Sequence, residues 1–76
     1  MRGKLDIIID ILEIAKKEVN KTGIVYGANL NFTVAEKYLV LLMKNGFVEN
    51  RQDKYLTTDR GKMILEKAKE IAPQLK

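Results

Sequence analysis

The amino-acid sequence predicts a mostly helical fold with one small β-hairpin. Apolar residues recur at helical spacing over residues 4–18, 33–45 and 58–72, which indicates three amphipathic helices. Residues 47–57 instead alternate as strands do, on either side of a polar tip. The chain has 76 residues and no cysteine, so a packed core rather than disulfides must hold it together. We expect one domain over residues 1–76.

The first predicted helix, residues 4–18, has an unusually wide apolar face. One stripe follows the i, i+3, i+4, i+7 spacing of an amphipathic helix and comprises Leu5, Ile8, Ile9, Leu12 and Ala15. A second stripe beside it comprises Ile7, Ile11 and Ile14. Two interpretations stay open: both stripes belong to a central core helix, or one of them faces a second subunit.

The segment 22–29 is short and contains two glycines. Its apolar residues fit a helix of one or two turns, which Asn20 or Thr22 would cap with its side-chain oxygen. The Ile-Val-Tyr sequence at 24–26 would suit a strand equally well. We interpret this segment as a second helix, and residues 29–32, with Asn29 and Asn31, as the turn that follows it.

Residues 33–45 begin with the Thr-x-x-Glu pattern of a capping box, in which Thr33 and Glu36 would each satisfy a free amide of the first turn. Gly46 would supply the left-handed residue that ends the helix. The pattern turns Ala35, Leu39 and Leu42 inward, with Tyr38 beside them, and leaves Val40 and Leu41 unassigned. This helix therefore has a polar beginning and a defined end.

Residues 47–57 predict a hairpin with a charged tip at residues 51–53. Because an isolated two-stranded hairpin is only marginally stable, we expect it to lean on the helices. Thr58 would cap a last helix over residues 58–72, and Pro73 would end it.

Composition excludes several classes of function. The chain has no cysteine and no histidine, which removes thiolate and imidazole metal ligands and the commonest general base. We therefore expect no enzyme, no metal and no cofactor. No apolar run approaches the about 18 residues that span a bilayer. Acidic residues interrupt the apolar residues near the amino terminus, so we expect this segment to belong to the mature protein rather than to a signal peptide. We expect the protein to be cytoplasmic.

Basic residues exceed acidic ones by 14 to 10, and the excess is concentrated between Asn20 and Lys62. That segment holds seven bases against four acids, whereas the two kinds balance from Met1 to Val19. A basic surface favours a polyanion as partner, although it also serves solubility.

The order of these elements predicts a winged helix-turn-helix. Helices 22–29 and 33–45 are joined by a tight turn, and the hairpin that follows would extend from the same side as a wing. A helix fits the major groove of B-DNA, so residues 33–45 would read bases there. Residues 50–54 of the wing would contact the phosphate backbone. The expected function is binding of double-stranded DNA by a transcriptional regulator or an architectural protein.

The candidate DNA contacts are Lys21, Thr22, Tyr26, Asn31, Thr33, Val34, Lys37, Arg51, Gln52 and Lys54. Several of them have a second interpretation. Thr33 would serve as a helix cap, and Tyr26 as a core residue with its hydroxyl at the rim. Lys37 would be an ordinary solvated helix residue, while Arg51 and Lys54 would only discourage edge-to-edge pairing of the hairpin. Their convergence on one side favours the DNA interpretation.

The stretches KTGIVYGANLNFTVAEKYLVLLMKNGFVEN and KYLTTDRGKMIL resemble a small archaeal winged helix-turn-helix family of nucleoid-type DNA-binding proteins and predicted transcriptional regulators. The matching positions are Thr22, Ile24, Tyr26, Ala28, Asn29, Leu30, Tyr38, Leu39, Leu42, Gly46, Tyr55, Thr58 and Gly61. The resemblance implies binding to double-stranded DNA, commonly as a dimer, in the nucleoid of the cytoplasm. The chain departs from it at Val34 and Glu36, where such proteins often carry Lys, Arg or Gln. Its last helix is also short compared with that of members that dimerise by a long antiparallel coiled coil.

A protein–protein interaction module on the same fold is the alternative function, because a fold alone does not fix function. The apolar Val40 and Leu41 favour it, and so does Glu36, whose negative charge opposes phosphate. We also expect a homodimer built from the first and last helices. The last helix would pack against its mate with help from Ile7, Ile11 and Ile14, because the helices carry more apolar surface than so small a core would hide.

Overall fold

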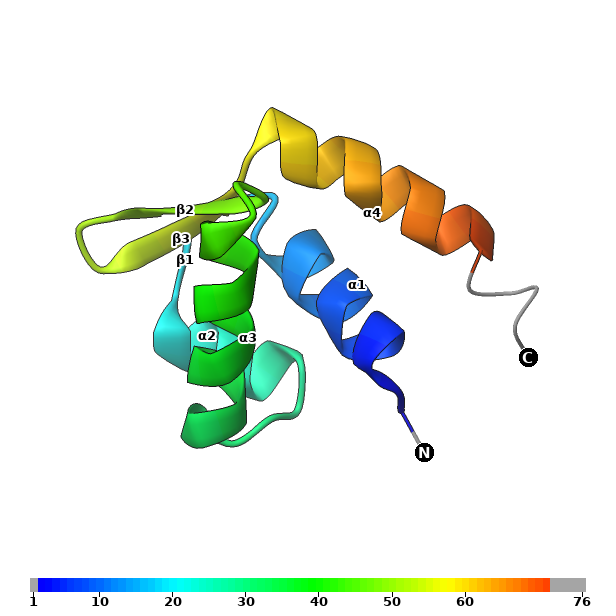
Figure 1. Ribbon diagram of the computed structural model, residues 1–76. Helices are drawn as coiled ribbons and strands as arrows, with labels where there is room; N and C mark the ends of the chain where they lie inside the picture. The colour runs from blue at the N-terminus through cyan, green and yellow to red at the C-terminus, as the bar shows by residue number, and fades with distance from the viewer. Residues whose placement is uncertain (1, 72–76) are drawn as a thin grey trace.

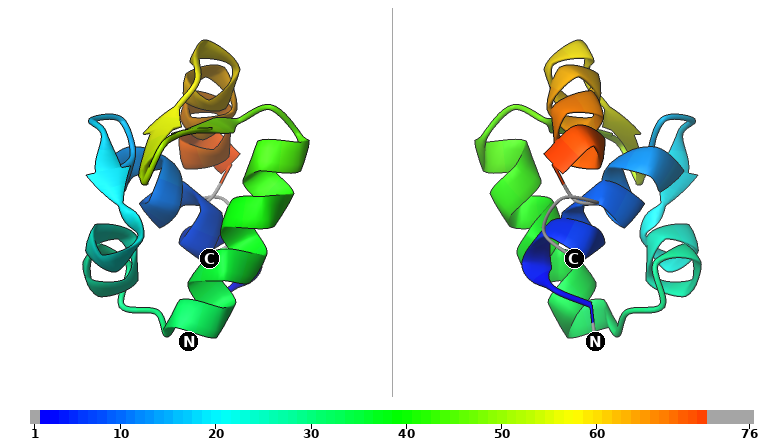
Figure 2. Two further views of the ribbon diagram at one scale, coloured as in Figure 1. Left: turned by 90° about the vertical axis from the view of Figure 1, so that its left-hand side faces the viewer. Right: turned by 90° about the vertical axis from the view of Figure 1, so that its right-hand side faces the viewer.

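The computed structural model describes residues 2–71. The other helices and the strands are arranged around the first helix, α1 (Lys4–Ile14). Along the chain follow α1 (Lys4–Ile14), β1 (Val19–Asn20), α2 (Lys21–Gly27), α3 (Phe32–Lys44), β2 (Val48–Arg51), β3 (Lys54–Thr57) and α4 (Asp59–Ile71). α4 lies alongside α1, and the β2–β3 hairpin projects away from both beside α3 (Figure 1). Viewed from either end, α1 lies between α2 and α3 and below α4 (Figure 2).

The buried core draws on all four helices and on both strands of the hairpin. Its members are Ile11, Leu12, Ile24, Ala28, Leu39, Leu42, Val48, Tyr55 and Leu65. Ile7 and Ile14 are half-buried and pack against this cluster. The second stripe of α1 therefore belongs to the core of the same chain. Because Ile11 is fully buried, the prediction that it contacts a second subunit is wrong.

Three antiparallel strands form the sheet, in the order β1-β3-β2. The hairpin has the predicted place, with Arg51 opposite Lys54 and a two-residue turn in which Gln52 has φ 59°. β1 was not predicted from the sequence. It is only two residues long, Val19 and Asn20, and pairs with the opposite edge of β3. So short a strand has no alternation that a pattern could reveal.

α1 ends at Ile14, whereas the sequence pattern predicted a helix through residue 18. The backbone N–H of Thr57 donates to the Ala15 carbonyl at 2.8 Å, and the Thr57 hydroxyl donates to the Leu12 carbonyl at 2.8 Å. Carbonyls of a last helical turn need partners from outside the helix. Because β3 supplies those partners here, the chain can leave the helix and enter β1.

α2 is a helix rather than a strand, and Asn20 is its cap. The Asn20 side-chain oxygen accepts from the Gly23 amide at 2.8 Å, as one of the two predicted caps would. At the other end Asn29 has φ 55°, and the amide of Leu30 donates to the Val25 carbonyl at 2.8 Å. This left-handed end forms the tight turn between α2 and α3.

α3 begins one residue earlier than predicted, and its cap is Asn31. The Asn31 side-chain oxygen accepts from the Val34 amide at 2.8 Å, so the predicted capping box of Thr33 and Glu36 is wrong. The predicted end is confirmed: Gly46 has φ 75°, and the Phe47 and Gly46 amides donate to the Leu42 and Met43 carbonyls at 2.9 and 3.0 Å.

α4 approaches the wing closely at Gly61. The Thr58 hydroxyl accepts from the Gly61 amide at 3.0 Å, which confirms the predicted cap. Lys69 Nζ lies 2.8 Å from Glu13 Oε1 and fastens the far end of α4 to α1. The ammonium of Lys69 lowers the pKa of the Glu13 carboxyl. The predicted stop at Pro73 lies outside the described residues. Among residues 2–71, no helix is both long and apolar enough to cross a membrane.

Gly61→Ala should destabilise the fold. A Cβ at this position would lie 2.1 Å from the Phe47 carbonyl oxygen and 2.8 Å from Cγ2 of Thr57. Since the nearer atom belongs to the backbone, it cannot rotate away, and we expect a loss of about 1–3 kcal/mol in the free energy of unfolding. Urea denaturation followed by circular dichroism measures it. Gly3→Ala is the control, because its Cβ would meet nothing nearer than Asp6 Oδ2 at 4.0 Å. Equal midpoints for the two variants would contradict the close approach.

Asn31→Ala should cost about 1 kcal/mol of stability, because it removes the side-chain cap of α3. Thr33→Ala, two residues away at an exposed position, should stay within about 0.5 kcal/mol of the parent. The same denaturation experiment compares the two. A larger loss of stability for Thr33→Ala than for Asn31→Ala would support the capping box and refute the cap at Asn31.

Candidate nucleic-acid interface

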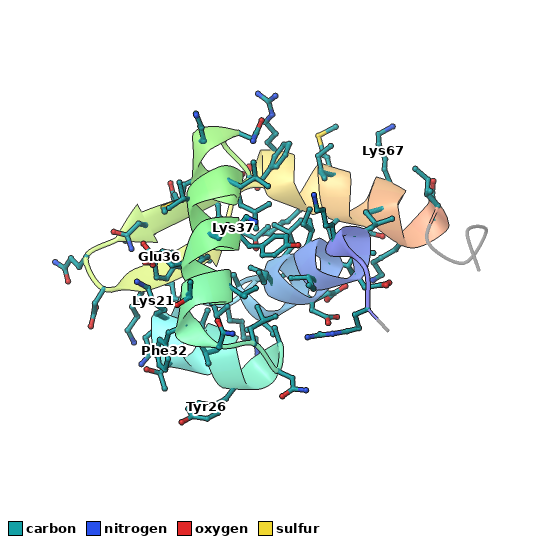
Figure 3. The ribbon with its side chains drawn as sticks, turned by 60° about the horizontal axis from the view of Figure 1, so that its bottom comes forward. Lys21, Tyr26, Phe32, Glu36, Lys37 and Lys67 are labelled. Atoms are coloured by element: carbon teal, nitrogen blue, oxygen red, sulfur yellow. The ribbon has the colours of Figure 1, made fainter. Side chains whose placement is uncertain are left out.

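The beginning of α2, the outer side of α3 and the wing lie on one side of the molecule. In Figure 3 the labelled Lys21, Phe32 and Glu36 lie on the side of α3 that is next to the wing, whereas Lys67 of α4 lies far from them. α3 contacts both α2 and β2 of the wing. The ten predicted contact residues belong to α2, to α3 with its cap, and to the wing.

The outer side of α3 is both polar and apolar. Thr33, Lys37, Val40, Leu41 and Lys44 are exposed, while Ala35, Leu39 and Leu42 on the opposite side are buried. Val40, which the sequence left unassigned, is 49% exposed. Val34 is half-buried, which leaves less of it for a ligand than the sequence analysis assumed. A helix that has three exposed side chains at i, i+4 and i+7 spacing can present them to one groove.

Lys21 and Glu36 form an ion pair that joins α2 to α3. The carboxylate of Glu36 accepts a hydrogen bond from the Lys21 ammonium and raises the pKa of Lys21. Both side chains remain partly exposed. From the sequence, Lys21 was predicted to contact DNA and Glu36 to form the capping box. The pattern does not reveal the pair, because the two residues are fifteen positions apart and meet only through the turn between the helices.

The wing carries two cations in different situations. Arg51 Nη2 lies 2.6 Å from Glu49 Oε1 on the same strand, so its charge is already paired. Lys54 is exposed and has no ion-pair partner within residues 2–71. Gln52 stands at the turn with its positive φ. Lys54 is therefore the wing cation best able to meet an external anion.

Two aromatic rings are exposed near the turn between α2 and α3. Tyr26 is 76% exposed, so the interpretation of Tyr26 as a core residue is wrong. Phe32, the first residue of α3, is 51% exposed. From the sequence, Phe32 was predicted to lie in the turn, without a role. Phe32 belongs to α3 because the cap at Asn31 starts the helix one residue earlier than predicted.

A shallow groove of about 270 Å³ lies between α1 and the outer side of α3. Its lining residues are Lys4, Lys37, Tyr38, Val40, Leu41 and Lys44. Three lysines thus surround a mainly apolar floor. Lys37 and Val40 belong both to this groove and to the outer side of α3, so a molecule that covers α3 would also cover part of the groove.

The chain is similar in sequence to known archaeal proteins. The chain is 38% identical over 71 residues to the uncharacterized protein MJ0290 of Methanocaldococcus jannaschii, covering 92% of this chain and 34% of that protein. It is 38% identical over 64 residues to the uncharacterized protein MJ0287 of the same organism, covering 83% of this chain and 66% of that protein. The chain therefore spans about a third and just under two thirds of these relatives.

A solved structure shares the fold. The crystal structure of Sso10a-2, a DNA-binding protein from Sulfolobus solfataricus, matches with a TM-score of 0.84 at 33% identity, over 95% of this chain and 80% of that one. A family model described as winged helix-turn-helix matches residues 1–76. The predicted fold and the predicted resemblance are confirmed: the chain belongs to the winged helix-turn-helix family.

Proposed function

We propose that the chain binds double-stranded DNA, with α3 in the major groove and residues 50–54 of the wing on the phosphate backbone. The observation that carries the proposal is that the wing lies beside α3, whose outer side is exposed, so that one duplex can meet both. A helix fits the major groove, and a basic hairpin beside it can follow the adjacent backbone. Membership of the winged helix-turn-helix family and likeness to a DNA-binding protein support it.

Each part of the interface has a distinct task in this proposal. Thr33 and Lys37 of α3 face the base edges, and Val40 offers an apolar contact to a thymine methyl group. Lys54 and Arg51 of the wing hold phosphates, which fixes the orientation of the protein without reading sequence. Of the two wing cations Lys54 contributes more, because Arg51 must share its charge with Glu49.

The biological role that follows is transcriptional regulation or organisation of the chromosome in the nucleoid of the cytoplasm. We propose no catalytic activity. A protein–protein module, the alternative from the sequence, relied on exposed Val40 and Leu41. Those residues lie on the side of α3 that DNA would cover, so their exposure requires no separate protein partner.

We further propose that the protein acts as a homodimer through α4. Met63 is 65% exposed and Ile71 is 50% exposed, so α4 keeps apolar surface that the core of one chain does not cover. The apolar excess is smaller than the sequence predicted, since the second stripe of α1 packs into the core. A two-fold axis would set two recognition helices about 34 Å apart, the spacing of successive major grooves.

DNA binding should weaken steeply with salt. If a dimer contacts about four to six phosphates, log affinity should fall against log salt with a slope of about −4 to −5, since each contact contributes about −0.9. Fluorescence anisotropy of a labelled duplex at several salt concentrations measures the slope. An affinity that is unchanged between low and moderate salt would refute the proposal.

Two lysine variants separate contact from general charge. Lys54→Ala should reduce the magnitude of the slope by about 0.9 for each wing that loses a phosphate. Lys67→Ala removes the same charge from an exposed position on α4, far from the interface (Figure 3), and should leave the slope unchanged. Equal effects of the two variants would mean that net charge alone drives binding.

Met63→Glu should convert the proposed dimer to a monomer, because it puts a charge where two copies of α4 would pack. Sedimentation velocity at micromolar concentration gives the mass of parent and variant. Lys62→Glu changes charge at an exposed position of the same helix, one residue before Met63 and directed to another side of the helix, and serves as the control. A parent that sediments as a monomer would refute the dimer and leave DNA binding by one chain intact.

A further inference from the structure

Glu36 is the only acidic residue of α3, and it stands in the proposed DNA interface. An acidic side chain next to phosphates weakens binding to every sequence. Its side chain is nevertheless 49% exposed, and its carboxylate is held by Lys21 at the beginning of α2. Such a residue costs affinity, and besides joining α2 to α3 through Lys21 its carboxylate can recognise a hydrogen-bond donor on a base.

The chemistry of the major groove decides which base that is. A carboxylate only accepts hydrogen bonds, so it needs a donor on the base edge. Cytosine offers the N4 amino group, whereas guanine presents only acceptors at N7 and O6. Adenine has a donor at N6 but also an acceptor at N7, which repels a carboxylate. Cytosine is therefore the base that suits Glu36.

We propose that Glu36 is a specificity-determining residue that selects a cytosine in the major groove. On a site with cytosine at the facing position, the carboxylate accepts from N4 and releases Lys21. The Lys21 ammonium, at the first residue of α2, is then available to a phosphate. This inference rests on the proposed function, and it adds a base preference that the function alone does not require.

On other sequences the ion pair persists and has a measurable consequence. Glu36 then keeps the ammonium of Lys21, so binding lacks one phosphate contact for each subunit. The pair lowers affinity for random DNA and leaves affinity for the cognate site intact. Specificity thus arises partly from a penalty on the wrong sequences.

Selection from a pool of random duplexes tests the base preference. The parent protein should enrich one position for cytosine, with a discrimination of about fivefold or more, the low end of the cost of one mismatch. Glu36→Gln should shift the preference at that position to adenine, because an amide can bond N6 and N7 together. Glu36→Ala should leave the position without preference.

Salt dependence on a random duplex tests the release of Lys21. Glu36→Gln frees the ammonium, so the slope of log affinity against log salt should steepen by about 0.9 per subunit. Adding Lys21→Met to Glu36→Gln should remove that gain. Both positions are partly exposed, and thermal unfolding of each variant checks that the fold is kept.

Glu49→Gln is the matched control. Glu49 is also a partly exposed acid paired with a cation, at 2.6 Å from Arg51, but it lies on the wing. Its removal should raise affinity for all duplexes alike and leave the selected sequence unchanged. If Glu49→Gln altered base preference as Glu36→Gln does, the effect would be one of charge and the inference would fail.

The possible failures are distinguishable. A parent protein that binds duplexes with no cytosine preference, or a Glu36→Gln variant that keeps it, would overturn the role of Glu36 and leave DNA binding standing. A parent protein that binds no duplex at low salt would instead overturn the proposed function itself.

Discussion

The link between Thr57 and the last turn of α1 is the constraint on which the rest of the structure depends. One residue of β3 donates twice, from its amide to Ala15 and from its hydroxyl to Leu12, both at 2.8 Å. The hydroxyl is buried, where an unpaired polar group would cost about 1–3 kcal/mol. The two bonds end α1, turn the chain into β1 and attach the hairpin to the core helix.

The orientation of the wing follows from that attachment and from one close approach. Thr57 is followed at once by Thr58, whose hydroxyl donates to the Gly46 carbonyl at 2.7 Å and caps α4. Gly61 then lets α4 pass against the backbone of Phe47. The end of α3, both hairpin strands and the beginning of α4 are thus fixed to one another. These contacts set the direction in which the hairpin carries Lys54 relative to α3.

Local patterns predicted most of the fold, and tertiary contacts account for what they missed. Gly46, Asn20 and Thr58 act within a few residues of their own positions, so their roles could be predicted from spacing. The end of α1 could not, because its determinant, Thr57, lies more than forty residues away. The cap of α3 was a local choice between Asn31 and Thr33. Asn31 prevails, and Glu36 contacts Lys21 instead of reaching back to its own helix start.

The candidate site was predicted less completely for the same reason. Residue types located the basic wing and the outer side of α3, but they could not tell paired cations from free ones. Lys21 and Arg51 are each held by a carboxylate, whereas Lys37 and Lys54 have no ion-pair partner within residues 2–71. An unpaired cation attracts the phosphates of any duplex. A paired cation contributes to binding only where an acceptor on a base or a phosphate replaces the carboxylate that holds it. An interface that combines both kinds can bind DNA generally and still discriminate among sequences.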